Sequence, residues 1–408
     1  MNRSKSIVMR ALPCSLICML AACGSGGGHS SSSPPPVSGD PAPTPTAPTP
    51  TPTPPPAITP TASQDPPPPP VTPPPSHAIT GVSFGWNSHR RAAVGSDNWP
   101  TTWSDDDHQY SIWGDGGGFG GSETKGRSSF GVARIEGDHD NYQGVNRYGG
   151  IGEECDSNID GKSHGAPLSV GGILYAWVTP ESNAKGYASF TLYSSRDKAC
   201  TWYPSDVVFE QARDGVSFGG FVQFGKDNSA AIDAYVYTIT TEVTETESLS
   251  IVQRPGRIML LRVPVGSIEQ RSAYEFFAGV DANGQPLWSK DAGAKSPIYQ
   301  DADGVGPFAQ MVFVPGLNRF VYSNQRGNGV DAAARTSLLT IAEAPHPWGP
   351  WTIVYDDLFF PQIEHTVFQW SFAPKWFRND GRDFTLIFSG IDSNDSWNTI
   401  DGTFTTAP

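Results

Sequence analysis

Apolar and polar residues alternate over short stretches along most of the chain beyond residue 78, and the spacing expected of helices is scarce. Alternation over about four to eight residues predicts half-buried β-strands, and the Gly, Asn, Asp and Pro between the stretches predict turns. Pairs of stretches predict hairpins at residues 95–119, 166–178, 220–238, 310–325 and 372–390. The pattern therefore indicates an all-β fold built from a repeated antiparallel unit.

Most of these hairpins are followed by further strand-like runs, at residues 130–137, 258–266, 337–345 and 351–357. Each repeat then covers about 65 residues, as expected for a four-stranded blade. Five repeats predict a five-bladed β-propeller over residues 78–408, closed by pairing of residues 81–87 or 403–405 with the last blade. A β-sandwich is the alternative, but it would not explain the repeated hairpin followed by two strands.

The first hairpin carries two isolated carboxylates, Asp97 and Asp115. Residues 99–103 predict its first strand, the acidic run 105–107 its turn, and residues 109–114 its second strand. Antiparallel pairing places both aspartates at one edge of the sheet and the acidic run at the opposite, solvated edge. Glycoside hydrolysis uses such a pair, with one carboxyl as acid and the other as base or nucleophile. The alternative is that both aspartates only shape turns.

In a propeller, the residues before the first strand and after the second strand of each blade collect around one central pocket. This rule predicts amides, hydroxyls, charged groups, an imidazole and indoles, a mixture that binds sugar hydroxyls and ring faces. The predicted substrate-binding residues are Asn98, Trp99, Lys162, Ser163, His164, Asn324, Gln325, Trp370 and Asp392, with Ser323, Gln369 and Ser389 on the same rim. Trp99 and Trp370 are the indoles expected to pack on sugar, and most other tryptophans are expected in the core.

Residues 1–22 predict a signal peptide, because Arg3, Lys5 and Arg10 precede an apolar run too short to span a bilayer. The ending LAAC favours a bacterial lipobox over an ordinary signal peptide, so Cys23 is predicted to be lipidated. Residues 23–77 are rich in Pro, Thr and Ser and predict a disordered tether. The expected location is the bacterial cell envelope, at the outer membrane or cell surface, with membrane contact through the lipid anchor alone.

The chain carries 27 basic and 41 acidic residues. This balance argues against nucleic acid as a partner and is compatible with an uncharged polysaccharide. Cys14 and Cys18 leave with the signal peptide, and Cys23 would carry lipid. Outside the cytoplasm the remaining pair, Cys155 and Cys200, predicts a structural disulfide between neighbouring sheets, with two free buried thiols as the alternative. The protein is expected to be a monomer.

Three motif matches fail on inspection. Residues 161–163 end like a phosphate loop, but Asp156 stands where glycine is required and no helix follows. Residues 156–161 match the first half of a calcium loop, but Pro167 replaces its closing Glu, so a structural calcium ion is left open rather than predicted. The run GDGGGFGG lies in a β context without a following helix and is no dinucleotide fingerprint. No cofactor and no metal ligand is predicted.

Several long motifs resemble a known family. They are GSDNWP and WGDGGGF in the first hairpin, GKSHG at residues 161–165, YEFFAGVDANGQPLWSKD at residues 274–291, and the closing segment 372–390. Over residues 80–405 the chain resembles domain of unknown function 4185, whose characterised members form glycoside hydrolase family 183. The resemblance implies a five-bladed propeller, endo-acting hydrolysis of D-arabinan and inversion at the anomeric carbon. By motif, it implies catalytic roles for Asp97 and Asp115.

Two alternatives to this activity are a non-catalytic carbohydrate-binding propeller at the cell surface and a hydrolase of another furanoside, such as L-arabinan or fructan. The first would keep the aromatic and amide groups without needing both aspartates. The second would keep the aspartates and differ in substrate.

Overall fold

The computed structural model describes residues 78–163, 165–179, 188–243, 253, 255–306, 309–326, 338–359, 367–390 and 395–407, all within one compact unit, Pro69–Pro408. These residues are almost entirely β-structure, in five antiparallel sheets that we number 1 to 5. No helix in this part of the chain is long and apolar enough to cross a lipid bilayer.

Sheets 1, 2 and 4 each contain four strands in sequential order. Sheet 1 contains β3 (Thr101–Trp103), β4 (Gln109–Trp113), β5 (Gly131–Glu136) and β6 (Gln143–Tyr148). Sheet 2 contains β7 (Leu168–Val170), β8 (Ile173–Val178), β9 (Ser189–Ser195) and β10 (Tyr203–Glu210). Sheet 4 contains β17 (Gln310–Val314), β18 (Arg319–Gln325), β19 (Leu338–Ala344) and β20 (Thr352–Leu358).

Sheets 3 and 5 carry additional strands. Sheet 3 contains β11 (Val216–Phe221), β12 (Tyr235–Glu242), β13 (Gly256–Pro264), β14 (Glu275–Val280), β15 (Pro286–Ser289) and β16 (Pro297–Asp301). Sheet 5 contains β21 (Val367–Phe372), β22 (Asp383–Gly390) and β23 (Trp397–Thr406), with β1 (Ile79–Phe84) and β2 (Arg90–Ala92) both paired to β23. The connections hold the short helix α1 (Gln211–Asp214) and the 3-10 turns η1 (Trp86–Ser88), η3 (Lys226–Asn228), η4 (Val265–Ser267), η5 (Arg271–Ala273), η6 (Ala292–Ala294) and η7 (Pro374–Trp376).

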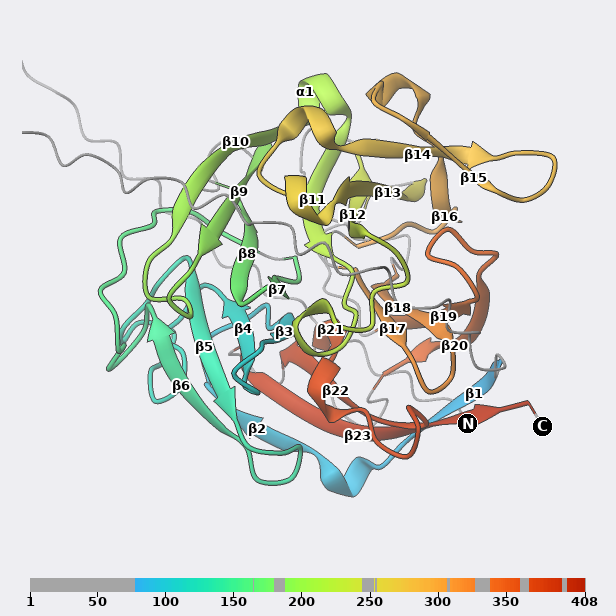
Figure 1. Ribbon diagram of the computed structural model, residues 1–408. Coiled ribbons are helices and arrows are strands. Elements are labelled where there is room, and N and C mark those ends of the chain that lie inside the picture. Colours follow the sequence, from blue (N-terminus) through green and yellow to red (C-terminus); the bar gives the residue numbers. More distant parts are fainter. Residues whose placement is uncertain are drawn as a thin grey trace, which may run out of the picture. The chain divides into compact units, whose positions relative to one another are not determined.

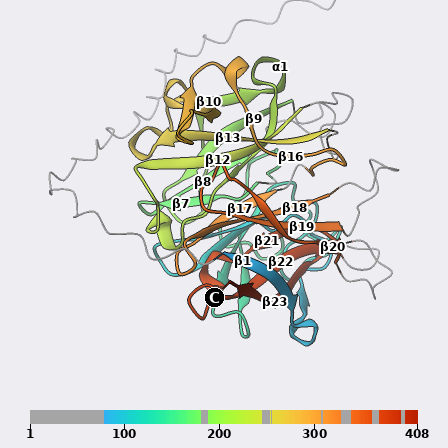
Figure 2. The same cartoon turned by 90° about the vertical axis from the view of Figure 1, so that its right-hand side faces the viewer.

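The sheets are arranged around a centre in a propeller-like way. In Figure 1 the strands β3, β7 and β21 lie toward the middle of the view, while β6, β10 and β23 lie toward its edge. Figure 2 shows the same sheets from the side, with sheets 3, 4 and 5 following one another. The first strand of a sheet is thus the inner one, and each sheet extends outward from it.

Five hydrophobic clusters lie between neighbouring sheets. One representative pair for each cluster is Phe130 with Trp202 between sheets 1 and 2, Trp177 with Phe221 between 2 and 3, Phe224 with Phe313 between 3 and 4, Val321 with Phe384 between 4 and 5, and Trp99 with Trp397 between 1 and 5. Burying one such side chain contributes about 1.5–3 kcal/mol. Each sheet is therefore stabilised mainly by the two sheets beside it.

Buried glutamines join inner strands across these boundaries. Gln223 Nε2 of sheet 3 donates to the Pro167 carbonyl beside sheet 2 at 2.7 Å. Gln310 Oε1 of sheet 4 accepts from the Phe372 N–H of sheet 5 at 2.5 Å. The amide groups satisfy backbone atoms that would otherwise be buried without a partner.

The first and last strands of the described unit close sheet 5. β1 runs antiparallel to β23, with Phe84 opposite Gly402. The prediction that residues 81–87 pair with the last sheet is confirmed for β1, and residues 403–405 lie in β23 itself. At the ends, the Ala407 N–H donates to the Ala78 carbonyl at 2.9 Å.

The hairpin strands agree with the sequence predictions except in sheets 3 and 5. The inner strand of sheet 5 is Val367–Phe372, so it ends at the residue where the predicted hairpin 372–390 begins. Pro374 explains the difference, because it lacks the N–H that a ladder needs and starts η7 instead. In sheet 3 the inner strand is Val216–Phe221, so it ends near the start of the predicted hairpin 220–238.

Candidate active site

The two predicted catalytic aspartates lie at one edge of sheet 1. Asp97 and Gly114 form an antiparallel bridge, with N–H···O distances of 3.0 and 2.9 Å in the two directions. A methyl group added to Gly114 would lie 3.9 Å from Asp97 Oδ1, so the Asp97 carboxyl lies near Gly114, whose next residue is Asp115. The backbone of Asp97 therefore lies beside that of Gly114, and the convergence of the Asp97 and Asp115 side chains stays a prediction. Their chemical roles stay predictions.

The backbone around the aspartates is strained at three non-glycine residues. The φ angles are 62° at Asn98, 58° at Asp115 and 53° at Gln369. Two of them, Asn98 and Gln369, are connected through Ser389: the Asn98 N–H donates to Ser389 Oγ at 2.9 Å, and Ser389 is paired with Phe368, which precedes Gln369. A left-handed conformation costs an L-residue about 1–2 kcal/mol, and such strain is concentrated at functional sites.

Asp97 is a buried carboxyl with an amide neighbour. The residue is 5% exposed, and Asn98 Nδ2 donates to Asp97 Oδ1 at 2.6 Å. The amide oxygen of Asn98 has no hydrogen-bond partner among the described residues. An unsatisfied buried acceptor costs about 1–3 kcal/mol, so a water molecule or a substrate hydroxyl would be bound favourably there.

Asp115 lies in a different environment, between two cations. Lys162 Nζ donates to Asp115 Oδ2 at 2.5 Å, and Arg127 Nη2 donates to Oδ1 at 3.1 Å. Arg127 also donates to the Asp115 carbonyl and forms an ion pair with Glu123. The Asp115 side chain remains 28% exposed. Asp115 is therefore held as a carboxylate that a ligand can reach.

Arg127 was not predicted as a site residue. It lies in the connection between β4 and β5, and nothing in the local pattern distinguishes it from a surface arginine. Lys162 was predicted to bind substrate, but its ammonium forms an ion pair with Asp115 and its side chain is only 8% exposed.

The glycines after Asp115 allow this connection to pack closely. A methyl group on Gly116 would lie 1.9 Å from the Gly95 carbonyl oxygen, and one on Gly117 would lie 1.9 Å from the Lys125 carbonyl oxygen. The Gly118 N–H donates to Ser96 Oγ at 2.9 Å. The glycine run therefore folds against the segment that carries Asp97, which explains its composition without a nucleotide.

The prediction that Trp99 and Trp370 pack on sugar is wrong for both ring faces. Trp99 is 1% exposed, and its ring lies 5.4–5.8 Å from those of Trp113, Phe119 and Trp397. Trp370 is also 1% exposed and packs on Phe359 at 5.7 Å. Both indoles are core residues, because they belong to the hydrophobic clusters between neighbouring sheets.

Other predicted binding residues are buried polar groups. Ser163 is 2% exposed and Asn324 is 1% exposed, and neither Ser163 Oγ nor either polar atom of the Asn324 side chain has a partner in the described part of the chain. Gln325 is buried, and its carbonyl accepts from the Gly306 N–H at 2.7 Å. Asn324 follows Ser323, whose Oγ donates to the Trp370 carbonyl at 2.8 Å.

Direct contacts thus link Asp97 with Asn98 and Asp115 with Lys162, while Asn324 and Gln325 lie on the strand next to β21. No described contact joins Asn324 or Gln325 to either aspartate. Three further predicted residues, His164, Asp392 and Cys23, lie outside the described residues.

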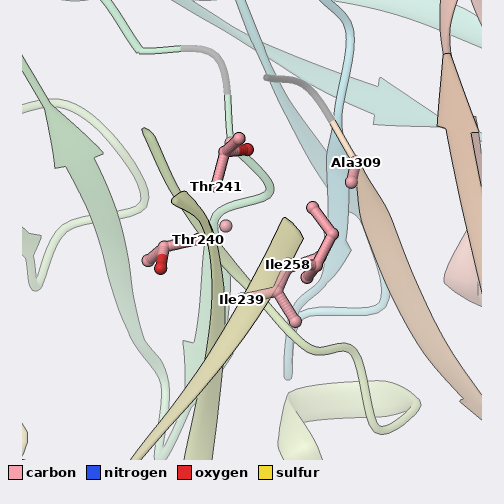
Figure 3. A pocket seen from close by; sticks show the side chains of 7 residues that line it. Ile239, Thr240, Thr241, Ile258 and Ala309 are labelled. Atoms are coloured by element: carbon pink, nitrogen blue, oxygen red, sulfur yellow. The ribbon is translucent and has the colours of Figure 1, made fainter. Parts of the chain in front are cut away.

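A small pocket lies elsewhere, between the inner strands of sheets 2, 3 and 4. Figure 3 shows Ile239, Thr240, Thr241, Ile258 and Ala309 around it, and Gly165 and Gly220 complete its lining. None of the predicted site residues lines this pocket. Its mostly aliphatic lining and small size suit no more than a water-sized guest, so it is no candidate for the reaction centre.

The acidic run at residues 105–107 is exposed, as predicted, but each aspartate is bonded. Asp105 forms an ion pair with Lys198 of sheet 2, and Asp107 forms ion pairs with Lys226 of sheet 3 and Lys375 of sheet 5. The hydrogen bond from Lys198 lowers the pKa of Asp105 from its ordinary value. The turn therefore ties four sheets together at the edge of sheet 1 opposite the Asp97 bridge.

The predicted disulfide between Cys155 and Cys200 is confirmed and joins the segment after β6 to the β9–β10 turn. The half calcium loop beside it serves a structural role, because Asn158 Oδ1 accepts from the Tyr148 hydroxyl at 2.8 Å. Within the described ranges, no group of three or more His, Cys, Asp or Glu is placed to hold a metal ion.

No protein-family model and no curated protein matches the chain. Among solved structures, it is similar to a GH43_1 enzyme from Xanthomonas citri at 12% identity, covering 79% of this chain and 94% of that chain with a TM-score of 0.46. It is similar to a GH62 hydrolase in complex with xylotriose at 8% identity, covering 80% and 97%, with a TM-score of 0.44.

An α-L-arabinanase of Penicillium chrysogenum complexed with arabinobiose is similar at 10% identity, covering 78% of this chain and 84% of that chain with a TM-score of 0.38. The structural neighbours are thus glycoside hydrolases. Identities and scores this low carry no inference about the activity of the present chain.

Proposed function

We propose that the chain is a glycoside hydrolase that cleaves internal D-arabinofuranosyl linkages of D-arabinan, with Asp97 and Asp115 as the acid–base pair. The observation that supports the proposal is the bridge between Asp97, which is buried, and Gly114, the residue before the partly exposed Asp115. Two carboxyl groups in unlike environments are what general acid–base cleavage of a glycosidic bond requires.

The choice of D-arabinan rests on the motifs that resemble glycoside hydrolase family 183, and the family implies inversion. In that mechanism one aspartate protonates the departing oxygen, while the other activates a water molecule on the opposite face of the sugar. The unpaired buried atoms of Asn98, Ser163 and Asn324 support a polar ligand in this region, because each gains a hydrogen bond from a bound hydroxyl.

We also propose that the five sheets are the blades of one closed ring. This is supported by the five hydrophobic clusters, each of which lies between two neighbouring sheets. In such a ring, one central pocket would be lined by Asp97 and Asp115 at the edge of sheet 1 and by Ser389 near the end of β22.

The decisive experiment replaces Asp97 and Asp115 with Asn, one at a time, and measures release of reducing ends from D-arabinan, L-arabinan and fructan. Each variant should lose about 10²–10⁴-fold of the rate, since one proton transfer is removed. The matched control is Asp106→Asn in the exposed turn, which should keep wild-type activity.

Near-normal cleavage by both Asn variants would refute the proposal that Asp97 and Asp115 are the acid–base pair. Binding of D-arabinan without cleavage by the wild type would indicate a carbohydrate-binding protein instead. Cleavage only of L-arabinan or fructan would keep the mechanism and change the substrate. The anomer first released, observed by NMR, tests inversion.

For the location, we propose a cell envelope lipoprotein that is anchored through Cys23 and carries the hydrolase on the tether of residues 23–77. A monomer without a cofactor suffices for this reaction. Metabolic labelling with a fatty acid should mark the wild type and not the Cys23→Ser variant, and equal labelling of both would overturn the anchor.

A further inference from the structure

Lys162 is a buried cation at the candidate active site. Its side chain is 8% exposed, and its Nζ lies 2.5 Å from Asp115 Oδ2. Its backbone is fixed to the end of β8 by two hydrogen bonds with Thr179, at 3.0 and 2.7 Å. The ammonium therefore approaches Asp115 from the segment leading into sheet 2, whereas Asp115 belongs to a connection of sheet 1.

Because Lys162 is buried, its ammonium needs a compensating anion close by. A buried ammonium is costly unless an anion compensates it, and removing one member of a buried pair leaves the other uncompensated. Asp115 is the anion that compensates Lys162. The bond is short and charge-assisted, so it holds one carboxylate oxygen in a fixed direction.

Arg127 binds the other oxygen of Asp115, but its ion pair with Asp115 is weaker than that of Lys162. The Arg127 side chain is 44% exposed and shares its charge with Glu123. Solvent screens an exposed pair of this kind, which contributes little to stability. Lys162 is thus the dominant constraint on the direction of the carboxylate.

We propose that Lys162 is a positioning residue that holds the Asp115 carboxylate in its orientation beside Asp97, and that it does not bind sugar. This inference rests on the proposed hydrolase function for its catalytic consequence. The charged groups around Asp115 are Lys162, Arg127 and, through Arg127, Glu123, with the carboxyl of Asp97 on the opposing segment. A carboxylate that is free to rotate would lose the alignment that proton transfer or water activation needs.

The kinetic experiment compares Lys162→Met, Lys162→Arg and Arg127→Met in the full chain with D-arabinan as substrate. Lys162→Met should lower kcat by about 100-fold while KM changes little, because ground-state binding is unaffected. Lys162→Arg should regain part of the lost kcat, and Arg127→Met should lose less than Lys162→Met. A raised KM with unchanged kcat would mean that Lys162 binds sugar and would overturn the proposal.

A second measurement does not depend on catalysis. Thermal unfolding midpoints are compared for Asp115→Asn, Lys162→Met and the double variant. Asp115→Asn leaves a buried ammonium without its anion, so its midpoint should fall, and adding Lys162→Met should restore part of the loss. Additive losses would show that the two residues do not act as a pair and would overturn the proposal. If the wild type cleaves none of the three polysaccharides, the proposed function fails, and these midpoints still decide whether Lys162 holds Asp115.

Discussion

Three residues near the bridge adopt a backbone conformation that glycine would adopt at less cost. Asn98, Asp115 and Gln369 all have positive φ, yet each keeps a polar side chain. Asparagine and aspartate tolerate this region better than most residues, but the cost of about 1–2 kcal/mol remains. Side chains kept at such a cost are expected to serve the site, and for Asn98 the hydrogen bond to Asp97 shows how.

Asn98 offers a test that separates strain from function. Asn98→Gly removes the amide that donates to Asp97 and relieves the backbone, whereas Asn98→Ala removes the amide and keeps the strain. Both variants should lose activity on D-arabinan by about 10-fold or more, since a charge-assisted hydrogen bond contributes about 1.5–3 kcal/mol. Only Asn98→Ala should lower the unfolding midpoint clearly. Full activity of Asn98→Gly, measured by reducing ends, would show that the amide is dispensable.

Single residues were predictable where their chemistry is local. The edge that Asp97 and Asp115 share follows from the hairpin alone, because antiparallel pairing fixes which ends meet. Burial was not predictable in the same way. Trp99 and Trp370 stand at the rim in sequence, but packing between sheets covers their rings. The contacts of Arg127 and Lys162 with Asp115 also depend on tertiary packing, which no local pattern encodes.

At the scale of elements, the inner strands are held together by side-chain amides as well as by apolar packing. Gln310 lies at the start of β17, is 2% exposed, and binds both backbone polar groups of Phe372, whose carbonyl accepts from Nε2 at 3.4 Å. β21 has a bulge between Phe368 and Ser371, so its own ladder is interrupted nearby. The amide of Gln310 therefore fixes the strand next to the strained Gln369.

Replacing Gln310 with Met tests this contact. The side chains have similar volume, but the Phe372 N–H would lose its partner in a buried position. The free energy of unfolding should fall by about 1–3 kcal/mol. The control is Gln143→Met at the exposed first residue of β6, which should change stability by less than about 0.5 kcal/mol. Denaturant unfolding of both variants gives the comparison, and equal stability of the two would contradict a role for the Gln310 amide.

The bounds of strands are predicted less accurately from sequence patterns than the presence of strands and turns. The Gly171–Gly172 turn and the strands of sheet 4 follow directly from turn residues and alternation, and the structure has them as predicted. The first strand of the predicted hairpin 372–390 lies earlier in the chain, at Val367–Phe372, because Pro374 follows it and Trp376 is buried in a turn. In this segment the apolar pattern mostly coincides with buried residues but does not distinguish a strand from a tight turn.

For the whole molecule, the repeat of a hairpin followed by outer strands predicted an all-β, propeller-like arrangement, and the structure has it. The repeat could be recognised in the sequence because each sheet is built from neighbouring segments of the chain, so the contacts within a sheet are mostly local in sequence. The contacts between sheets could not be predicted from the sequence. The ion pairs of Asp105 and Asp107 with lysines of three other sheets join segments that are far apart in the chain.

The hydrogen bond between Ala407 and Ala78 places the two ends of the described unit side by side on one sheet. A short linker could join them, and the chain could then be cut in any exposed hairpin turn without removing a strand from its sheet. A permutant cut in the β17–β18 turn would keep every sheet intact and would move the attachment of the N-terminal segment from sheet 5 to sheet 4. The point at which a tether joins the folded unit would then be an adjustable property of the molecule.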